Sequence, residues 1–399
     1  QEVLRFEAVS ETSYMFGPDD WSGEGAILED ERVIAALEAR GITDLTMVQC
    51  GAGSTAFMGD ADEEGRRIGR GGCRSRIGSV NGLGDPVHGL IITVDLETQE
   101  VLNVVDEGPG PQVGPVADHH LEVMPEPREA LPPIVVSQPQ GRGFTLDGSQ
   151  VAWESWRFHF RLDPRRGVVL SRVGHEIDGD FRSVLYSGAL SELFVPYNAP
   201  MEPWSHQAYY DLASYAQAFT GIAGSLEPGE DCPAYAHYVD TWVMRPDGAP
   251  GRVAKAACLF ERPGAEPAWR HGRSDFIESR ARTDLVLRMI MQAGNYDYLF
   301  DWVFDQNGSI RIGVGATGIA EVKTVIEADA TTRPAGDVRA DAYGRFVAPH
   351  IVAVNHDHYF NFRIDLDVDG PRNDFLIDRL ESVTLPEDNP RRSVWVVDE

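Results

Sequence analysis

Two histidines separated by a single residue form the strongest local chemical pattern in the sequence. His356-Asp357-His358 lies in an apolar run, residues 351–363, that predicts a β-strand. Because side chains at positions i and i+2 of a strand point to one face, both imidazoles can reach one ion, and copper or zinc suits nitrogen ligands. A stable site normally needs a third protein ligand. The alternative is a pair of solvated or hydrogen-bonded histidines with no metal.

Two aspartates repeat this spacing further along the chain. Asp365 and Asp367, together with the backbone carbonyl of Leu366, offer the oxygen ligands that calcium or a similar divalent cation prefers. The alternative is that both carboxylates are simply solvated on a strand.

A tyrosine lies within a second apolar run. Gly294-Asn295-Tyr296-Asp297-Tyr298 is part of residues 285–304, and a turn, Asp305-Gln306-Asn307-Gly308, follows it. The nearly alternating Val, Ile, Phe and Trp residues predict two paired antiparallel strands, which would hold the phenol of Tyr296 rigidly. From residue type alone, Tyr296 is a core aromatic whose hydroxyl has a hydrogen-bond partner.

The elements that must position these residues are mostly short strands, so we expect a mainly β protein with a large antiparallel β-sandwich. Val/Ile/Phe/Trp-rich runs separated by Gly, Pro and Asp turns indicate this architecture. Besides the pair around Tyr296, the expected strands are residues 153–162, 167–173, 181–186, 193–196, 309–314, 321–326 and 346–363.

A small α+β domain is expected before the sandwich. An amphipathic helix is predicted at residues 30–40, and strands are predicted at 43–48, 89–96 and 100–105. The predicted domains are therefore an α+β domain at residues 1–112, a proline-rich extended linker at 113–142 and the sandwich at 143–399.

Composition narrows the classes of partner. The 399 residues include 63 acidic and 35 basic side chains, a formal charge of −28. This charge opposes binding to nucleic acid or anionic lipid and suits a cationic small substrate. No apolar run approaches the length of a membrane span and the first residues are not a signal peptide, which leaves the compartment open because a leader could have been removed. No glycine-rich loop joins a strand to a helix, so a nucleotide cofactor is not expected.

Four cysteines are too few for a disulfide scaffold. Cys232 and Cys258 flank a hairpin-like stretch whose ends could approach each other, and a bridge there would contribute roughly 3 kcal/mol in the chain-entropy model. Two buried free thiols are the alternative. Cys50 and Cys73 have no evident mates beyond each other, and Cys73 is expected in a loop rich in Gly and Arg.

Taken together, these residues resemble the copper-containing amine oxidases, whose cofactor, topaquinone, is an oxidised tyrosine. Asn295-Tyr296-Asp297-Tyr298 is similar to the family's Asn-Tyr-Asp/Glu-Tyr, and His356-Asp357-His358 follows sixty residues later. Upstream, Tyr210-Asp211-Leu212-Ala213-Ser214-Tyr215 resembles Phe/Tyr-Asp-x-Gly-Glu-Tyr. The resemblance covers about residues 30–399 and includes three further matches: Val195-Pro196-Tyr197, Trp156-Arg157-Phe158 and the 26-residue separation of Cys232 from Cys258.

The resemblance implies a role for each matching residue. Tyr296 would be the precursor of topaquinone, with Asn295 beside it, and His356 and His358 would be two of three copper(II) ligands. The remaining implied roles are the catalytic base for Asp211, a hydrogen bond to the quinone oxygen for Tyr197, the gate of the substrate channel for Tyr209, a peripheral metal site for Asp365, Leu366 and Asp367, and the family's disulfide for Cys232 and Cys258.

The implied reaction is the oxidative deamination of a primary amine. The amine would attack a quinone carbonyl to form a Schiff base, and Asp211 would remove a proton from the substrate carbon. Hydrolysis and reoxidation by O₂ would then give an aldehyde, ammonia and hydrogen peroxide. For this role Asp211 should be partly desolvated with a raised pKa; the alternative is a surface aspartate in a Tyr-rich loop.

The match is incomplete at the copper site. The family's third copper histidine lies far beyond the His-x-His motif, and none of His119, His120, His175, His206 and His237 occupies its place. We therefore expect a partner subunit or a further piece of polypeptide to supply it, in a homodimer or a dimer of heterodimers. A second function class, a non-catalytic β-sandwich scaffold or partner subunit derived from such an enzyme, stays open. Departures from the family pattern at Gln292, Asn198, Ala213, Ser214 and Asp301 leave the amine itself open.

Overall fold

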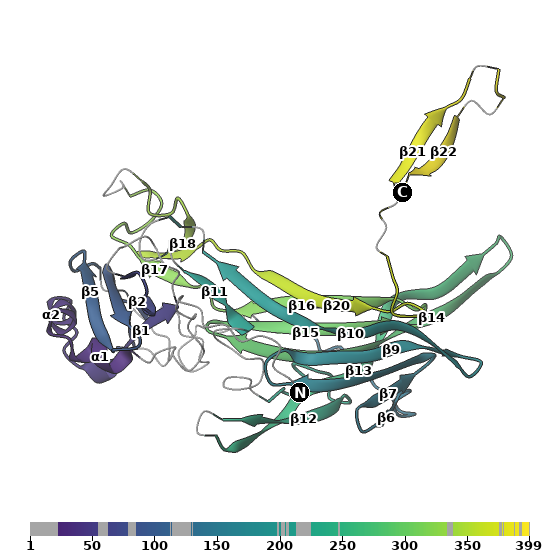
Figure 1. Ribbon diagram of the computed structural model, residues 1–399, viewed down its shortest axis with the longest axis horizontal. Helices are drawn as coiled ribbons and strands as arrows, with labels where there is room; N and C mark the ends of the chain where they lie inside the picture. The colour runs from purple at the N-terminus through teal and green to yellow at the C-terminus, as the bar shows by residue number, and fades with distance from the viewer. Residues whose placement is uncertain are drawn as a thin grey trace.

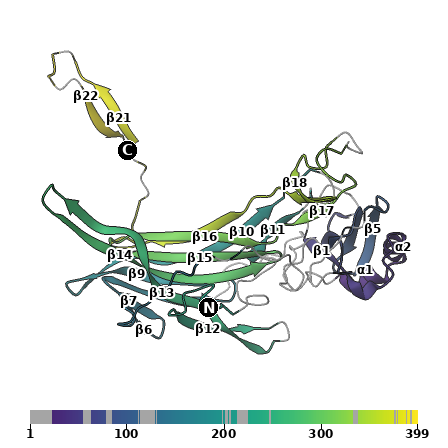
Figure 2. The same cartoon turned by 180° about the vertical axis from the view of Figure 1, so that it is seen from behind.

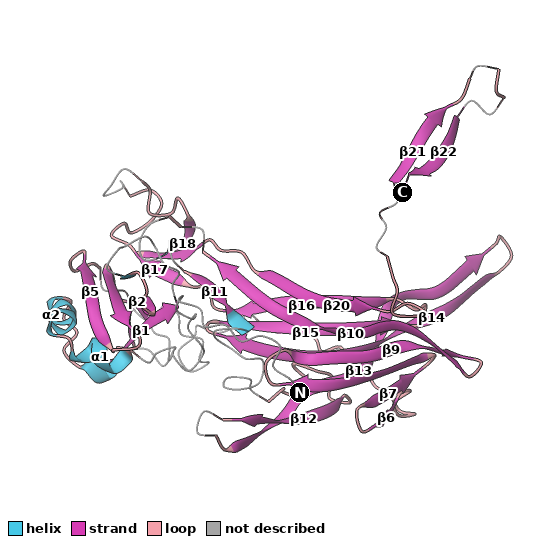
Figure 3. Cartoon of the chain, viewed as in Figure 1, coloured by secondary structure: helices cyan, strands magenta, loops and turns pink. Residues whose placement is uncertain are grey.

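The computed structural model confirms the mainly β, antiparallel architecture (Figure 3). It describes residues 23–54, 63–78, 85–111, 113, 129, 131–197, 199–200, 204, 207–212, 225–245, 248–332, 338–374, 377, 379–386, 388–390 and 393–398. In these ranges, no helix is long and apolar enough to cross a membrane.

Two helices cover a small sheet at the N-terminal end of the described chain. The helices are α1 (Glu24–Glu29) and α2 (Glu31–Ala39); a short 3₁₀ turn, η2 (Leu45–Met47), precedes a sheet of β1 (Val48–Ser54), β2 (Ile68–Ser75), β3 (Asp85–Pro86), β4 (Leu90–Asp95) and β5 (Glu100–Asp106). The sheet order is β1-β2-β4-β5, with β3 beside β2. The carboxylate of Asp30 accepts the backbone N–H groups of Arg32 and Val33 and so begins α2, which confirms the predicted helix.

The first strand begins later in the structure than predicted. Residues 43–47 do not form a strand, because the Asp44 carboxylate accepts the N–H of Thr46 and starts η2 instead. The strand itself begins at Val48. The helix α1 was not predicted, and the strands expected at 89–96 and 100–105 correspond to β4 and β5.

The hairpin of β1 and β2 has two chemically different faces. Cys50 and Cys73 are directly opposite each other and form a disulfide within the buried core of this sheet, so the loop predicted around Cys73 is in fact strand β2. Cross-strand partners share a face, and the residues on either side of each cysteine therefore lie on the opposite face, which carries glycine and arginine. That face carries Gly51, Gly53, Arg70, Gly72 and Arg74.

The larger part of the chain is a sandwich of two antiparallel sheets (Figures 1 and 2). The first contains β6 (Thr145–Asp147), β7 (Gln150–Trp153), β8 (Trp156–Asp163), β9 (Gly167–Ile177), β10 (Asp180–Pro196), β11 (Ala208–Tyr210) and β20 (Tyr359–Leu366). The second contains β12 (His237–Met244), β13 (Pro250–Gly272), β14 (Ile277–Ala293), β15 (Tyr296–Asp305) and β16 (Ile310–Gly318). Aromatic rings from both sheets fill one core, in which Phe158 stacks on Phe304 with ring centres 4.3 Å apart.

Two smaller sheets complete the described structure. One contains β17 (Val322–Thr324), β18 (Gly344–Ala348) and β19 (Ile351–Val354), and it lies near the N-terminal sheet. The other is a hairpin of β21 (Arg379–Thr384) and β22 (Ser393–Asp398), which projects away from the sandwich in both views.

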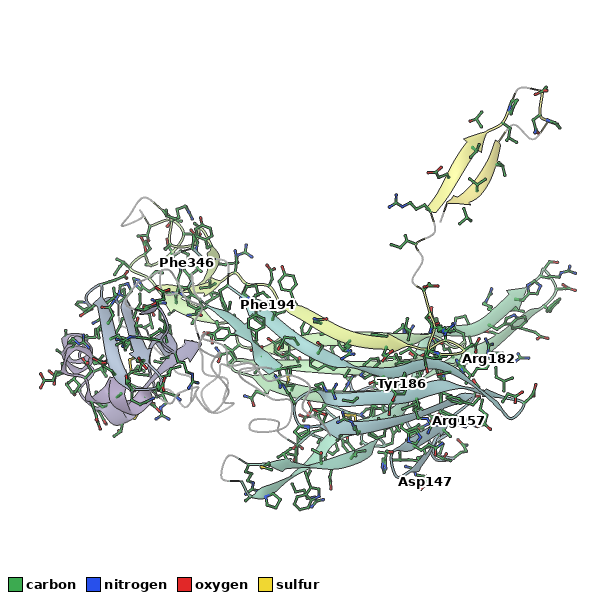
Figure 4. The ribbon with its side chains drawn as sticks, viewed as in Figure 1. Asp147, Arg157, Arg182, Tyr186, Phe194 and Phe346 are labelled. Carbon is green, nitrogen blue, oxygen red and sulfur yellow. A yellow bond between two sulfur atoms is a disulfide. The ribbon has the colours of Figure 1, made fainter. Side chains whose placement is uncertain are left out.

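Several predicted strands have different limits in the structure. The strands predicted at 181–186 and 193–196 are one continuous strand, β10, along which Arg182, Tyr186 and Phe194 are labelled in Figure 4. The strand predicted at 346–363 is instead three strands, β18, β19 and β20. It is interrupted because β19 pairs with β17 and β18, whereas β20 pairs with β10 in another sheet.

The second pair of cysteines is also joined. Cys232 and Cys258 form a disulfide at the hairpin of β12 and β13, so the free-thiol alternative is excluded for this pair. The predicted domain limits at residues 112 and 142 remain predictions. Within the predicted linker, residues 131–142 form no helix or strand.

A buried carboxylate fastens the end of this linker to the sandwich. Glu261 on β13 accepts the indole N–H of Trp153 at 2.8 Å, the backbone N–H of Gly143 at 2.7 Å and the side-chain amide of Gln138 at 2.8 Å. A carboxylate offers acceptors only, which matches these three donors.

Replacing Glu261 with glutamine should lower the free energy of unfolding by about 1 to 3 kcal/mol, because the new NH₂ group must face an N–H donor that then loses its acceptor. Urea denaturation followed by tryptophan fluorescence measures the change. Glu278→Gln, at an exposed position on β14, is the matched control. Equal denaturation midpoints for the two variants would contradict the assignment.

Candidate active site

A cavity of about 460 Å³ lies between the N-terminal sheet and one end of the sandwich. Its wall includes the glycine and arginine face of β1 and β2, the turn between β14 and β15, and β17. Five residues singled out in the sequence line it together, although they come from three separate segments: Tyr197, Tyr209, Asp211, Asn295 and Tyr296. The fold therefore brings these five residues to one cavity.

Tyr296 is the first residue of β15, immediately after the hairpin turn. Gly294 has a φ of 56°, a left-handed conformation that glycine adopts without strain, and this lets the turn close in two residues. The Tyr296 hydroxyl accepts the backbone N–H of Glu321 at 2.9 Å and lies 3.4 Å from the hydroxyl of Tyr197. Burial raises the pKa of Tyr296.

The two histidines lie beside this ring, but not on a continuous strand as predicted. His356-Asp357-His358 occupies the break between β19 and β20, where His356 forms an isolated bridge with Tyr197. The N–H of Asp357 donates to the carbonyl of Pro196 at 3.3 Å. The ring centres of His356 and His358 are 5.4 and 5.2 Å from that of Tyr296 and 4.8 Å from each other. The imidazoles are thus adjacent, for a reason other than strand periodicity.

Both histidines have the geometry expected of ligands to one metal ion. Nδ1 of His356 lies 2.7 Å from the carbonyl oxygen of Val354 and must donate its proton to it. The lone pair of Nε2 is then available to bind a metal ion. Nδ1 of His358 lies 2.9 Å from the hydroxyl of Tyr298, so its Nε2 can serve in the same way. Two imidazoles bound through nitrogens at about 2.0 Å would have ring centres roughly 4.5 to 5 Å apart, which matches their separation.

The described residues provide only part of a metal site. Among them, no group of three or more His, Cys, Asp or Glu side chains is arranged to hold an ion. His175 stacks on Trp156, with ring centres 3.8 Å apart, and His237 lies on β12. His119, His120 and His206 fall outside the described residues.

Asp211 lies just after β11 and is only 6% exposed. Burial, and then the negative charge of Glu192, raise the pKa of Asp211 to about 7. Glu192 is held nearby, because its Oε1 accepts the N–H groups of Leu193 and Leu212, each at 2.9 Å. The expected desolvation of Asp211 is confirmed, and the surface alternative is excluded.

Two tyrosines form an aromatic wall beside the histidines. Tyr197 is buried and stacks on His356 with ring centres 4.6 Å apart, and it meets Tyr209 edge to face at 6.0 Å. At the same end of the sandwich, Phe194 on β10 packs against the rings of Tyr210 and Tyr359 (Figure 4). The gating role of Tyr209 stays a prediction.

The aspartates predicted to bind a peripheral cation lie away from this cavity. Asp365 is on β20 opposite Ser187, roughly 23 Å along an extended chain from His358 at 3.3 Å per residue. Asp367 follows the end of β20 and donates its N–H to the carbonyl of Val184. Its Oδ1 is buried without a hydrogen-bond partner, which suits a cation, although described residues supply no third charged ligand.

Two residues of the cavity were missed in the sequence. Arg74 on β2 pairs with the carboxylate of Glu321, whose backbone N–H reaches Tyr296. The alternation of Gly and Arg in residues 69–74 was the available signal for a strand. Nothing in the spacing links Arg74 to Glu321, because 247 residues separate them.

Two protein-family models match this chain, one over its N-terminal part and one over the sandwich. The model described as the copper amine oxidase N3 domain matches residues 22–119, and that of the copper amine oxidase enzyme domain matches residues 145–399. The chain belongs to the copper amine oxidase family. The amine oxidase [copper-containing] gamma 1 of Arabidopsis thaliana is 37% identical over 375 residues, which cover 90% of this chain and 51% of that protein.

Other copper amine oxidases are also similar to this chain in sequence or in fold. The primary amine oxidase of Klebsiella aerogenes is 34% identical over 326 residues, covering 81% of this chain and 42% of that protein. The chain spans about half the length of the curated relatives it matches. A copper-containing benzylamine oxidase from Hansenula polymorpha has the same fold, with a TM-score of 0.76 and 22% identity over 98% of this chain and 61% of that one.

One departure from the copper amine oxidase pattern has a clear structural partner. Asp301 on β15 lies opposite Arg288 on β14 and accepts two hydrogen bonds from its guanidinium, at 2.7 and 2.8 Å. Gln292 is the second-last residue of β14 and lies opposite Asp297. Asn198, Ala213 and Ser214 lie outside the described residues.

Proposed function

We propose that this chain carries the reaction centre of a copper- and topaquinone-dependent primary-amine oxidase. The overall reaction is RCH₂NH₂ + O₂ + H₂O → RCHO + NH₃ + H₂O₂. The observation that carries the proposal is the cavity in which a desolvated carboxylate, Asp211, shares the wall with Tyr296, whose ring lies beside two histidines. The names of the relatives, copper-containing and primary amine oxidases, support it.

Each site residue has a separate role in the proposed mechanism. When present, the quinone derived from Tyr296 supplies an electrophilic carbonyl, and copper with O₂ supplies the oxidising chemistry. His356 and His358 would hold the copper, and Tyr298 fixes the orientation of His358 through its hydroxyl.

Asp211 is the proposed catalytic base. With a pKa near 7, it is ionised often enough to accept a proton from the substrate carbon and basic enough to hold it. Tyr197 would donate a hydrogen bond to the oxygen of residue 296, from which its hydroxyl is now 3.4 Å away. Asp211 and Tyr197 are themselves buried, which strengthens their polar interactions.

Assembly is the second part of the proposal. A complete copper site needs a third protein ligand, which the described residues do not supply and which would come from further polypeptide, either within a homodimer or from a second chain. Asp365, the carbonyl of Leu366 and Asp367, whose Oδ1 has no partner, would hold a calcium-like cation. The charge of −28 favours a positively charged amine. Native mass spectrometry tests the assembly, and a lone 44.0 kDa monomer would count against it.

The decisive test is the chemical state of residue 296. The protein is purified with copper and oxygen, together with any companion chain, stained for a redox-active quinone, and digested for peptide mass. We expect the peptide with Tyr296 to gain two oxygens and lose two hydrogens. Tyr296→Phe should abolish the stain, whereas Tyr186→Phe, at an exposed position on β10, should keep it. An unmodified Tyr296 under these conditions would favour the non-catalytic scaffold.

A further inference from the structure

We infer that Arg74, on the N-terminal sheet, is a positioning residue for Tyr296 and Asn295 and that it acts through Glu321. The inference rests on the proposed function for its catalytic consequence, but its structural part concerns only side chains of this chain. It gives the N-terminal sheet a role in the reaction centre beyond forming a wall.

A continuous series of polar contacts joins the two parts. The guanidinium of Arg74 pairs with Oε2 of Glu321, and Oε1 of the same carboxylate accepts the side-chain amide of Asn295 at 3.1 Å. The backbone N–H of Glu321 donates to the hydroxyl of Tyr296 at 2.9 Å. One residue, Glu321, therefore contacts both residues at the turn that presents the reactive ring, and Arg74 holds its carboxylate.

The ion pair lies in a place where it is strong enough to set geometry. The side chains of Arg74 and Glu321 are only 21% and 17% exposed, and both line the cavity. Charges paired away from bulk water are screened weakly, and removing one partner leaves the other charge buried and uncompensated. Without Arg74, the Glu321 carboxylate would have to rotate towards water, which breaks its contact with Asn295, or take up a proton, which weakens that contact.

The arginine is itself held in place by its strand. Arg74 lies opposite Gln49 on β1, next to the cross-strand pair that forms the Cys50–Cys73 disulfide. Its neighbours on the cavity face, Gly51 and Gly72, have no side chains to hinder its reach.

The far end of the connecting segment is also fixed. The hydroxyl of Thr324 on β17 donates to the carbonyl of Pro86 on β3 at 2.8 Å. Residues 321–324 are thus attached to the N-terminal sheet at both ends. Of the two attachments, only the Arg74 pair also leads to Tyr296, so it is the one that transmits the position of the sheet to the ring.

Fluorine NMR of the copper-free protein tests the structural part. The protein is labelled with 3-fluorotyrosine, and Tyr296→Phe assigns the Tyr296 resonance. We expect that resonance to move or divide in Arg74→Met and in Glu321→Gln, because the ring loses its single orientation. Arg74→Lys should restore most of the original spectrum. The control is Arg40→Met, which removes an arginine at the C-terminal end of α2 that is paired with Asp106 and does not belong to this series of contacts.

A second measurement follows the conversion of Tyr296 by peptide mass after copper is added. We expect Arg74→Met to slow it roughly ten- to a hundredfold relative to Arg40→Met, since small displacements of a reacting group have effects of this size. If Arg74→Met does not fold, the double variant Arg74→Met/Glu321→Gln removes both charges without leaving one buried alone.

The outcomes separate the two proposals. A Tyr296 resonance and a conversion rate that are the same in Arg74→Met, or in the double variant, as in Arg40→Met would overturn the inference. A resonance that follows Arg74 in a protein whose Tyr296 never converts would support the positioning role and contradict the proposed function.

Discussion

Replacing Asp211 with asparagine should lower kcat for a primary amine by about a thousandfold, the usual contribution of a general base. The amide has nearly the shape of the carboxylate but cannot accept a proton. Because asparagine fits the same buried space and places no charge there, the substitution should leave the fold intact. Steady-state turnover with a simple primary amine measures the effect. An Asp211→Asn variant that keeps a tenth or more of the wild-type kcat would contradict the role.

The pH dependence of the same residue gives an independent measurement. The folded-state pKa of about 7 lies above the ordinary value of 3.8 for an aspartate, so activity should rise as pH passes through 7 and Asp211 ionises. The stability that comes from this group has the opposite trend: it is fully present below pH 3.8 and is lost as pH rises through 7. Above pH 7, Asp211→Asn should therefore unfold at a higher temperature than the wild type. Glu192→Gln keeps the acceptor for Leu193 and Leu212 but removes the neighbouring charge, and should shift the activity profile to lower pH.

Replacing either His356 or His358 with alanine should prevent both copper binding and the conversion of Tyr296. A metal site that loses one imidazole typically loses most of its affinity, and this pair contributes two of its ligands in the proposed site. The copper content of the purified protein and the mass of the peptide with Tyr296 measure the two effects.

The matched control for these histidines is His175→Ala. His175 is also part-buried and also stacks on an aromatic ring, but that ring is Trp156, within the sandwich core. We expect this variant to bind copper as the wild type does. Full copper occupancy in both His356→Ala and His358→Ala would refute the assignment of the metal site.

Local patterns predicted the parts of this fold that depend on neighbours in sequence. The alternation before and after Tyr296 predicted the hairpin of β14 and β15 because side-chain periodicity is a property of each strand alone. The helix at residues 30–40 was predicted because its apolar residues recur with helical spacing, and the structure adds that Asp30 caps it. The break at residues 355–358 could not be predicted in this way, since it arises where the chain passes from one sheet to another and changes its hydrogen-bond partners.

The same division applies to the site. Tyr296, Asp211 and the two histidines were identified because their neighbours in sequence form family motifs. Arg74 and Glu321 belong to no motif, and their importance depends on a contact between two sheets that the sequence does not specify locally. The direction of the Asp211 pKa shift was expected from its role, whereas its second cause, the charge of Glu192, required the three-dimensional arrangement.

The glycines of β1 and β2 differ in whether a side chain can be added to the wall of the cavity. A methyl group added at Gly53 would lie 3.7 Å from the ring of Tyr209, an ordinary contact that narrows the cavity without disturbing the sheet. One added at Gly71 would lie 1.9 Å from the carbonyl oxygen of Gly51 and would force the two strands apart. The shape of the cavity can therefore be altered by adding a single methyl group at Gly53, whereas Gly71 does not permit such a change.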